Sequence, residues 1–222
     1  MKQFEKIRIK KPQSSVFDLS HERKMTMNMA ELTPILCQEV LPGDRFKVNV
    51  EMLVRLQPML APIMHRVNVY THFFFVPNRL IWNQWEDYIT GKYADNPELE
   101  PNHPRITGSQ SQQKTYMGNG SLADYLGYPD TTQVSLDEGD TYPISQLPFR
   151  AYQLIWNNYY RDQNLQPEFA LDLSSADADL STVYGQALVG MRTRCWEKDY
   201  FTSCLPSAQR GAVVNLPLGS LS

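Results

Sequence analysis

Histidines are the side chains that most often carry acid–base or metal chemistry, and this 222-residue sequence has four of them. Two of the four, His65 and His72, lie seven positions apart in one apolar stretch. On an extended strand an odd separation puts two side chains on opposite faces, so these two cannot bind one metal ion together. The sequence also lacks Cys-x-x-Cys pairs, phosphate-binding glycine loops and a Gly-x-Ser-x-Gly nucleophile. We therefore expect structural histidines, no metal, no cofactor and no catalytic residues.

The strongest chemical signal is a basic arm over residues 1–14. Its cations are Lys2, Lys6, Arg8, Lys10 and Lys11, against a single acid, Glu5. Clustered cations neutralise phosphates without reading base sequence, and Phe4 among them could stack on an unpaired base. Basic arms also pack on neighbouring subunits. The pattern therefore predicts contact either with single-stranded DNA or with another protein subunit.

The composition is that of an ordinary folded protein. Hydrophobic residues make up 42% of the sequence and charged residues 20%, which argues against disorder. A formal net charge of −3 gives the whole chain no general attraction for polyanions. Three widely spaced cysteines match no disulfide or zinc pattern, so we expect buried, reduced thiols made in a cytoplasm. No secretory signal is recognisable and no run of about 18 apolar residues occurs, so we expect no membrane insertion.

The first secondary-structure elements that the sequence predicts are β-strands. Residues 44–56 alternate apolar and polar positions, which predicts a strand with one buried face after a turn at 41–44. The apolar members are Phe46, Val48, Val50, Met52, Val54 and Leu56. Residues 65–76 are largely apolar or aromatic on both faces and end at Pro77, which predicts a strand covered on both sides. We expect two or three antiparallel strands within residues 35–76.

Helices follow the strands. Aromatic residues at helical spacing predict a helix over 81–90 that ends at Gly91. Ser121 begins a capping box before a short helix over 122–126, and Pro148 suits the first position of a longer helix.

Two segments carry no such periodicity. Residues 92–118, with three prolines and a Ser/Gln-rich run, predict a long loop. Residues 162–180 hold five acids and no base, and we expect a solvated loop there rather than a metal site.

Several longer motifs resemble one known family. They are residues 17–24, 37–46, 62–79, 82–91, 147–162 and 194–201. In this order they resemble the major capsid protein of the small icosahedral single-stranded DNA bacteriophages (Microviridae), above all the gokushovirus type. The resemblance covers roughly residues 15–218, apart from loops at about 92–118 and 165–186. It matches the N-terminal portion of the family, whose members are longer than this chain.

The resemblance implies a fold and a function. The fold would be mainly β, a jelly-roll (β-sandwich) viral capsid fold with helical and long-loop insertions, incomplete in this chain. Residues 1–14 would be an arm and residues 15–222 one capsid-type domain. The function would be structural rather than enzymatic, in a T=1 icosahedral shell around circular single-stranded DNA.

The same resemblance implies partners and a location. The partners would be other copies of the chain, the DNA genome, other virion proteins including a small basic DNA-binding protein, and a host surface receptor. The protein would be located in the virion, after synthesis in the cytoplasm of a bacterial host.

Aromatic residues are the natural candidates for contacts between copies, because protein interfaces are enriched in them. We expect the subunit interface among Trp82, Tyr88, Tyr152, Tyr160 and Trp196, with core packing as the competing interpretation for each. A second class of function also stays open, a small jelly-roll module that binds carbohydrate or nucleic acid. Such a module would remain monomeric or dimeric, whereas a shell protein forms large particles.

Overall fold

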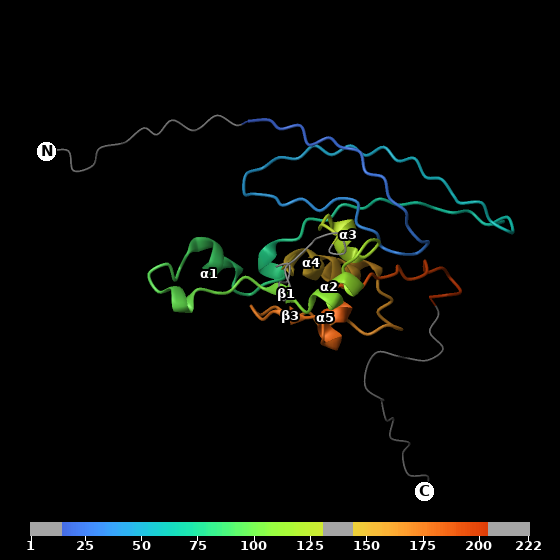
Figure 1. The fold of residues 1–222 in the computed structure, drawn as a ribbon. Helices are drawn as coiled ribbons and strands as arrows, with labels where there is room; N and C mark the ends of the chain where they lie inside the picture. The colour runs from blue at the N-terminus through green and yellow to red at the C-terminus, as the bar shows by residue number, and fades with distance from the viewer. Residues whose placement is uncertain (1–14, 131–143, 204–222) are drawn as a thin grey trace, which may run out of the picture.

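The structure, a computed structural model, describes residues 15–130 and 144–203 (Figure 1). The short helices and three very short strands of the described residues all lie after residue 77, and residues 15–77 form long loops. In chain order the elements are η1 (Asn78–Leu80), α1 (Trp85–Thr90), η2 (Pro97–Leu99), β1 (Arg105–Thr107), α2 (Gln110–Tyr116), α3 (Leu122–Leu126), β2 (Ile144–Ser145), α4 (Leu147–Ile155), the π-helix η3 (Trp156–Tyr160), β3 (Ala178–Asp179) and α5 (Val183–Leu188).

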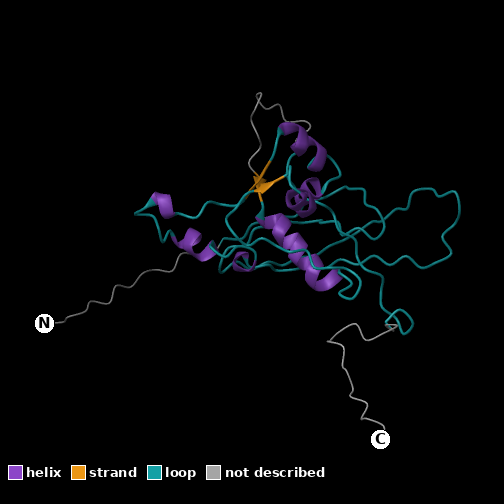
Figure 2. Ribbon diagram, turned by 90° about the horizontal axis from the view of Figure 1, so that it is seen from below, coloured by secondary structure: helices purple, strands orange, loops and turns teal. Residues whose placement is uncertain are grey.

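Helix α4 and the helices around it form the core, which we call the helical body (residues 78–130 and 144–194). Figure 2 shows these helices close to the single small sheet, with loops extending to one side. The main core cluster consists of Ile106, Met117, Leu122, Ala123, Ile144, Phe149, Tyr152, Ala178, Leu180, Leu188 and Val189. A smaller cluster of Ile81, Trp82 and Leu147 joins the start of α4 to the segment before α1. Aromatic and aliphatic residues of α4 thus face more than one side.

The sheet has the order β2-β1-β3, with β1 antiparallel to β2 and parallel to β3. Ile106 of β1 is paired with Ile144 and with Ala178, and all three side chains are buried. This small sheet joins three distant parts of the chain, but it is no jelly roll.

Three helix predictions are confirmed. Helix α1 begins at Trp85 rather than at residue 81, but it ends as predicted, where Gly91 takes the left-handed conformation (φ 61°) that glycine adopts without a side-chain clash. Helix α3 spans the predicted residues, and the Ser121 hydroxyl accepts the Asp124 backbone N–H. Helix α4 begins at Leu147, with Pro148 in its first turn.

The loop predicted over residues 92–118 is wrong in part. Residues 110–116 form α2, which begins with a capping box between Ser109 and Gln112. The Ser109 hydroxyl accepts the Gln112 N–H, and the Gln112 side chain accepts the Ser109 N–H at 2.8 Å. Reciprocal caps of this kind start a helix without help from hydrophobic periodicity, which is why the Ser/Gln-rich run was misleading.

The strands predicted within residues 35–76 do not form in the described chain. Figure 1 shows this stretch, in blue to cyan, as a long loop over the labelled helices. No residue from 45 to 76 makes a backbone–backbone hydrogen bond there, and Phe73 and Phe75 are 59% and 74% exposed. A strand needs a paired neighbour, and the small sheet of the described residues lies elsewhere. The predicted two-sided burial is therefore also wrong for this chain on its own.

Two smaller findings complete the fold. Cys37 is exposed and Cys195 half-buried, both as free thiols, so the expected burial is not seen for these two, and Cys204 lies outside the described residues. Among the described residues, no helix is both long enough and apolar enough to cross a membrane.

Candidate assembly surface

A stripe of buried polar side chains along α4 and η3 holds the helical body together. It consists of Gln146, Arg150, Gln153 and Asn157, each at most 4% exposed. Their spacing of four, three and four residues places them on one side of a helix. Each one donates to a backbone carbonyl of another segment, so this polar stripe satisfies buried backbone groups around α4.

Arg150 is the centre of the polar stripe. Its guanidinium donates to the Gln146 side chain and to the carbonyls of Ile81 and Ser174, each at 3.0 Å. Burial lowers the pKa of this guanidinium, because the charged form loses its water. The arginine thereby ties the segment before α1 to the loop before β3.

Gln153 connects α4 to the end of α5. Its amide donates to the carbonyl of Leu188 at 2.8 Å, and its oxygen accepts Arg192 Nε at 2.7 Å. Arg192 in turn stacks on the rings of Trp156 and Phe169, with its guanidinium carbon 4.9 Å from each centroid. Stacked and hydrogen-bonded, this arginine fixes the chain that leads from α5 toward residue 195.

The π-helix η3, together with Arg194, contacts residues 70–74. Phe74 lies 4.8 Å from the Tyr159 ring and 6.0 Å from the Tyr160 ring, measured between centroids. His72 Nδ1 shares a hydrogen bond with the Tyr160 hydroxyl and stacks on its ring. Arg194 lies over the Tyr70 ring at 5.1 Å. Residues 70, 72 and 74 thus point toward the helical body, as alternate positions of one extended segment should.

The other alternate positions of this segment, together with the apolar positions of residues 44–56, leave an exposed apolar surface. We call residues 44–56 and 65–76 together the ribbon. Its outer face carries Phe46, Val48, Val50, Met52, Val54, Leu56, Val67, Val69, Thr71, Phe73 and Phe75. The ten apolar members of this face are 44–74% exposed. A contact of 3.3 Å from the Thr71 hydroxyl to Met52 Sδ shows that the two segments share this face.

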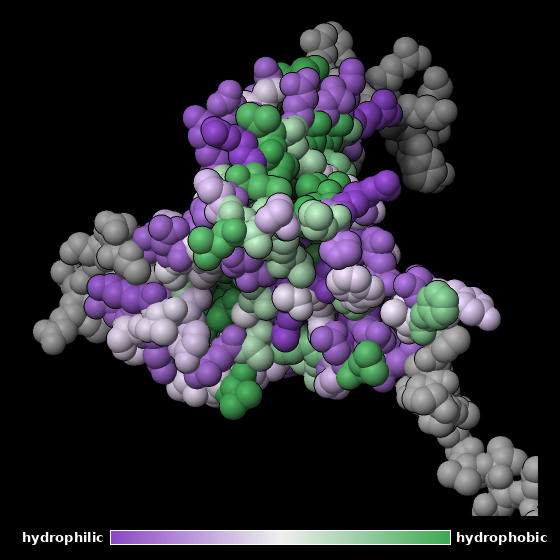
Figure 3. Space-filling view, turned by 90° about the vertical axis from the view of Figure 1, so that its right-hand side faces the viewer, coloured by the Kyte–Doolittle hydropathy of each residue, from purple (hydrophilic) through white to green (hydrophobic). Residues whose placement is uncertain are grey.

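Figure 3 shows apolar side chains gathered over the upper part of the molecule, where the ribbon runs. A continuous, exposed apolar surface of this kind marks an interaction site.

A second exposed group consists of the aromatic residues after the helical body. Trp196, Tyr200 and Phe201 are 82–83% exposed. The Asp199 carboxylate accepts the N–H groups of Phe201 (2.8 Å) and Thr202 (2.7 Å), so the turn that carries them is ordered by its own hydrogen bonds. Pre-organised, exposed aromatic side chains are typical anchors of protein interfaces.

The structure separates the five predicted interface residues. Trp82 is fully buried and Tyr152 is 8% exposed, so for these two the core interpretation holds and the interface prediction is wrong. Tyr152 donates to the Leu32 carbonyl, and burial raises its pKa to about 12. Tyr88 and Tyr160 are half-buried, in ring contact with Trp82 and His72 respectively. Among the five, Trp196 alone is largely exposed and so can contact a neighbouring subunit.

The predicted DNA contacts cannot be placed in the same way. Lys2, Lys6, Arg8, Lys10 and Lys11 all lie outside the described residues. Within residues 15–130 and 144–203, no three His, Cys, Asp or Glu side chains come together as metal ligands would.

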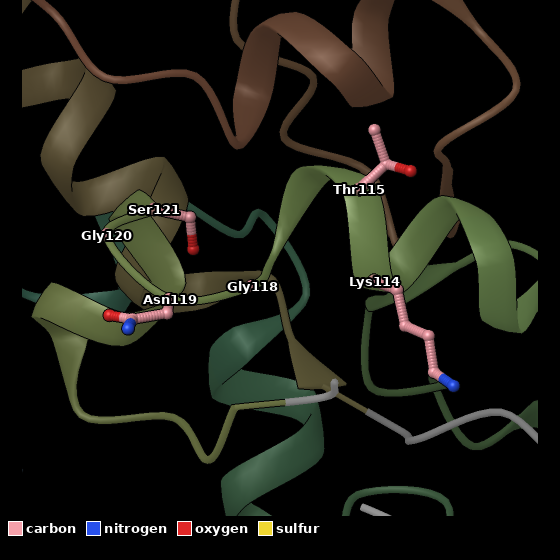
Figure 4. A pocket seen from close by; sticks show the side chains of 6 residues that line it. All are labelled: Lys114, Thr115, Gly118, Asn119, Gly120 and Ser121. Atoms are coloured by element: carbon pink, nitrogen blue, oxygen red, sulfur yellow. The ribbon is translucent and has the colours of Figure 1, made fainter. Parts of the chain in front are cut away.

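Two hollows are too poorly organised to be ligand sites. A hollow of about 520 Å³ is lined by Lys114, Thr115, Gly118, Asn119, Gly120 and Ser121. Figure 4 shows that the Lys114 side chain points away from those of Asn119 and Ser121, so no polar groups converge there.

The second hollow, of about 400 Å³, lies beside Arg105, Ser175 and Asp177, whose polar groups are partly used within the fold. Asp177 accepts the Arg105 N–H at 2.8 Å, and Ser175 accepts the Trp82 indole N–H at 2.8 Å. His103, which also lines it, is half-buried, and burial lowers its pKa. We therefore interpret this hollow as a place where segments of the fold meet and bond to one another, and not as a ligand site.

Comparison with known proteins gives one consistent family. The sequence pattern of the family described as "Capsid protein (F protein)" matches residues 6–222. Capsid protein VP1 of Chlamydia phage 1 is 38% identical over 217 residues, which cover 91% of this chain and 35% of that protein. Capsid protein VP1 of Bdellovibrio phage phiMH2K is 36% identical over 208 residues, 93% of this chain and 36% of the relative.

A third relative agrees with these two. Capsid protein VP1 of Spiroplasma virus 4 is 31% identical over 217 residues, 95% of this chain and 37% of the relative. The chain therefore spans little more than a third of the length of these curated relatives.

Proposed function

Because the chain belongs to the capsid protein (F protein) family, we propose that it is a structural virion protein that assembles with copies of itself into an icosahedral shell. The observation that carries this proposal is the family match over residues 6–222, together with relatives that are each named capsid protein VP1. The shell would enclose a circular single-stranded DNA genome. Its mechanism is binding, without catalysis or a cofactor.

The proposed fold of the assembled protein is a jelly-roll β core with helical and long-loop insertions, in a T=1 shell. Residues 15–222 would belong to one capsid-type domain that is the N-terminal part of a longer jelly roll. The two-residue period of the ribbon and its exposed apolar face support this proposal. The helical body would then be one of the insertions.

The proposed partners follow from the same family membership. They are other copies of the chain, the DNA genome, other virion proteins including a small basic DNA-binding protein, and a host surface receptor. The proposed location is the virion, after synthesis in the host cytoplasm. Exposed Trp196, Tyr200 and Phe201 support contacts with other protein subunits.

A chimaeric capsid protein tests the function. The 222 residues would replace the matched region of capsid protein VP1 of Chlamydia phage 1, and the product would be examined by light scattering and negative-stain microscopy. We expect regular particles, because a shell subunit must keep both its fold and its contacts when it takes a relative's place. The unaltered relative is the positive control.

The opposite result would favour the alternative function. The chimaera would then fold but give no particles. The 222-residue chain alone would stay monomeric and bind a glycan or an oligonucleotide. Together these two results would indicate a small binding module.

Deleting residues 1–11 tests the proposed DNA contact of the arm. We expect single-strand affinity at low salt to fall about tenfold or more. In a plot of log affinity against log salt concentration, the slope should become less steep by about three, because five cations no longer displace counterions. Fluorescence anisotropy with a labelled oligonucleotide over a salt series measures both quantities. Lys114→Gln, which removes one exposed cation elsewhere, is the matched control and should change little. Unchanged DNA binding with impaired assembly would instead assign the arm to a neighbouring subunit.

A further inference from the structure

Residues 83–100, which we call the lobe, project from the rest of the helical body and contain α1 (Figure 1). The chain enters the lobe after Trp82, which is fully buried. It returns through residues 101–104, where Pro101 and Pro104 are both buried. The two ends of the lobe are therefore fixed, and the contact between them decides how firmly the lobe is held.

An aromatic contact closes the base of the lobe. The His103 ring lies 5.5 Å from the Trp82 ring and 5.9 Å from the Tyr88 ring, measured between centroids. Both contacts are edge-to-face, with interplanar angles of 64° and 68°. Trp82 and Tyr88 also contact each other at 4.9 Å. One imidazole ring thus holds the returning chain against the chain that enters the lobe.

The surroundings of His103 disfavour a positive charge on its ring. Its Nε2 atom lies 3.5 Å from the Ser145 hydroxyl. The titratable or charged groups around it come from several elements: Tyr88 of α1, Arg105 of β1, Arg150 of α4 and Asp177 of the loop before β3. Burial lowers the pKa of His103 most and the two arginines lower it further, whereas nearby backbone carbonyls act in the opposite direction.

We propose that His103 is an acid-sensitive latch, whose protonation loosens the ring contact with Trp82 and Tyr88 and frees the lobe from the rest of the helical body. Protonation adds a charge beside two arginines, in a site from which water is partly excluded. When the lobe opens, that charge returns to water. The latch goes beyond the proposed function and does not depend on it, because it concerns the shape of the chain rather than its assembly.

The direction of the pH effect follows from proton linkage. A histidine whose pKa is lower in the closed lobe than its ordinary value of 6.5 binds protons better when the lobe is open. The closed lobe is therefore fully stable above about pH 6.5 and loses stability as the pH falls below that value. Each unit by which the closed-state pKa lies below the open-state pKa raises the opening equilibrium by at most about tenfold.

Attraction between a protonated ring and aromatic faces works against the latch. If this attraction from Trp82 and Tyr88 dominated, the pKa of His103 would lie above its ordinary value, and acid would tighten the lobe. Burial and the two nearby arginines favour the opposite direction. The measured pKa of His103 therefore distinguishes the two cases directly.

Two measurements on the 222-residue chain test the latch. Proton NMR of the imidazole resonances over a pH series gives the pKa of His103, and comparison with His103→Phe assigns its signal. Amide hydrogen exchange in residues 84–100, corrected for the intrinsic effect of pH, gives the opening equilibrium. We expect protection of these amides to fall about threefold or more between about pH 7.5 and about pH 5.5.

His103→Phe also provides the matched comparison for hydrogen exchange. Phenylalanine keeps a ring against Trp82 and Tyr88 but takes up no proton, so protection of the lobe should be equal at the two pH values. His65→Phe makes the same change at an exposed histidine and should keep the acid-induced loss of the natural chain. His103→Gln, which is neutral and polar, replaces the phenylalanine variant if that variant does not fold.

Three results would overturn the proposal: a pKa of His103 at or above its ordinary value, lobe protection that is the same at both pH values, or an equal acid-induced loss in His103→Phe. The first would show that attraction to the aromatic rings dominates. The last would assign the acid sensitivity to another group, such as Asp177. None of these results touches the proposed function, because particle formation by the chimaeric protein is measured separately.

Discussion

Arg150→Met should lower the free energy of unfolding by about 3–5 kcal/mol, enough to unfold much of the helical body. The substitution removes three hydrogen bonds of 3.0 Å and leaves the buried carbonyls of Ile81 and Ser174 and the Gln146 side chain without donors. Methionine fills a similar length, so the loss reports hydrogen bonds rather than a cavity. Urea unfolding followed by tryptophan fluorescence measures it as a lower midpoint at unchanged slope.

Arg105→Met is the control for Arg150. Arg105 lies in β1 and is exposed, so replacing it with methionine should lower the free energy of unfolding by less than about 0.5 kcal/mol. Arg150→Lys should fall between the two, because a lysine keeps the charge but not the planar group of donors. If Arg150→Met is as stable as the natural chain, the cost of burying the charge outweighs its hydrogen bonds, and the polar stripe is not what holds the helical body together.

Local signals in the sequence predicted local structure well. Gly91 and Gly127 end helices in the left-handed conformation, and Ser121 caps α3, as the end signals indicate. Each of these features depends on a few consecutive residues, so no tertiary information is needed. The same holds for the capping box of Ser109 and Gln112, whose signal is present in the sequence and would have identified α2.

The polar stripe of α4 was the main feature that the sequence analysis missed. Gln146, Arg150, Gln153 and Asn157 recur at helical spacing, but polar residues on such a stripe normally face water. Their burial depends on segments 12 to 69 residues away in sequence, such as Phe169 and Ile81. A polar stripe flanked on both sides by aromatic residues is the signal that could have indicated a buried polar face.

The candidate interface shows a different limit. Trp82 and Trp196 are the same residue type, yet one is fully buried and the other 82% exposed. Composition favours both as interface residues, and only the packing around them decides between core and surface. For the ribbon, the alternation correctly identified an apolar face, but pairing requires a second strand that periodicity within one segment cannot supply.

Gly185→Ala should lower the free energy of unfolding by about 3 kcal/mol, even though alanine is the better helix former by about 1 kcal/mol. Gly185 lies in α5, where a Cβ would stand 2.1 Å from the Asp179 carbonyl oxygen and 2.6 Å from its carbon. Both atoms belong to the backbone of β3, so relief requires α5 to move away from the sheet. That movement would open the core at buried Leu188.

Gly190→Ala provides the matched control for Gly185. A Cβ there would meet its nearest atom, the Ala187 carbonyl oxygen, at 3.4 Å, which is an ordinary contact. We expect its free energy of unfolding to stay within about 0.5 kcal/mol of that of the natural chain, while the urea midpoint of Gly185→Ala falls sharply. Equal midpoints for the two variants would mean that α5 shifts freely on the sheet. In that case the close approach of α5 to β3 does not constrain the helical body, and the ribbon would rest on a less rigid support than its contacts with Tyr159 and Tyr160 imply.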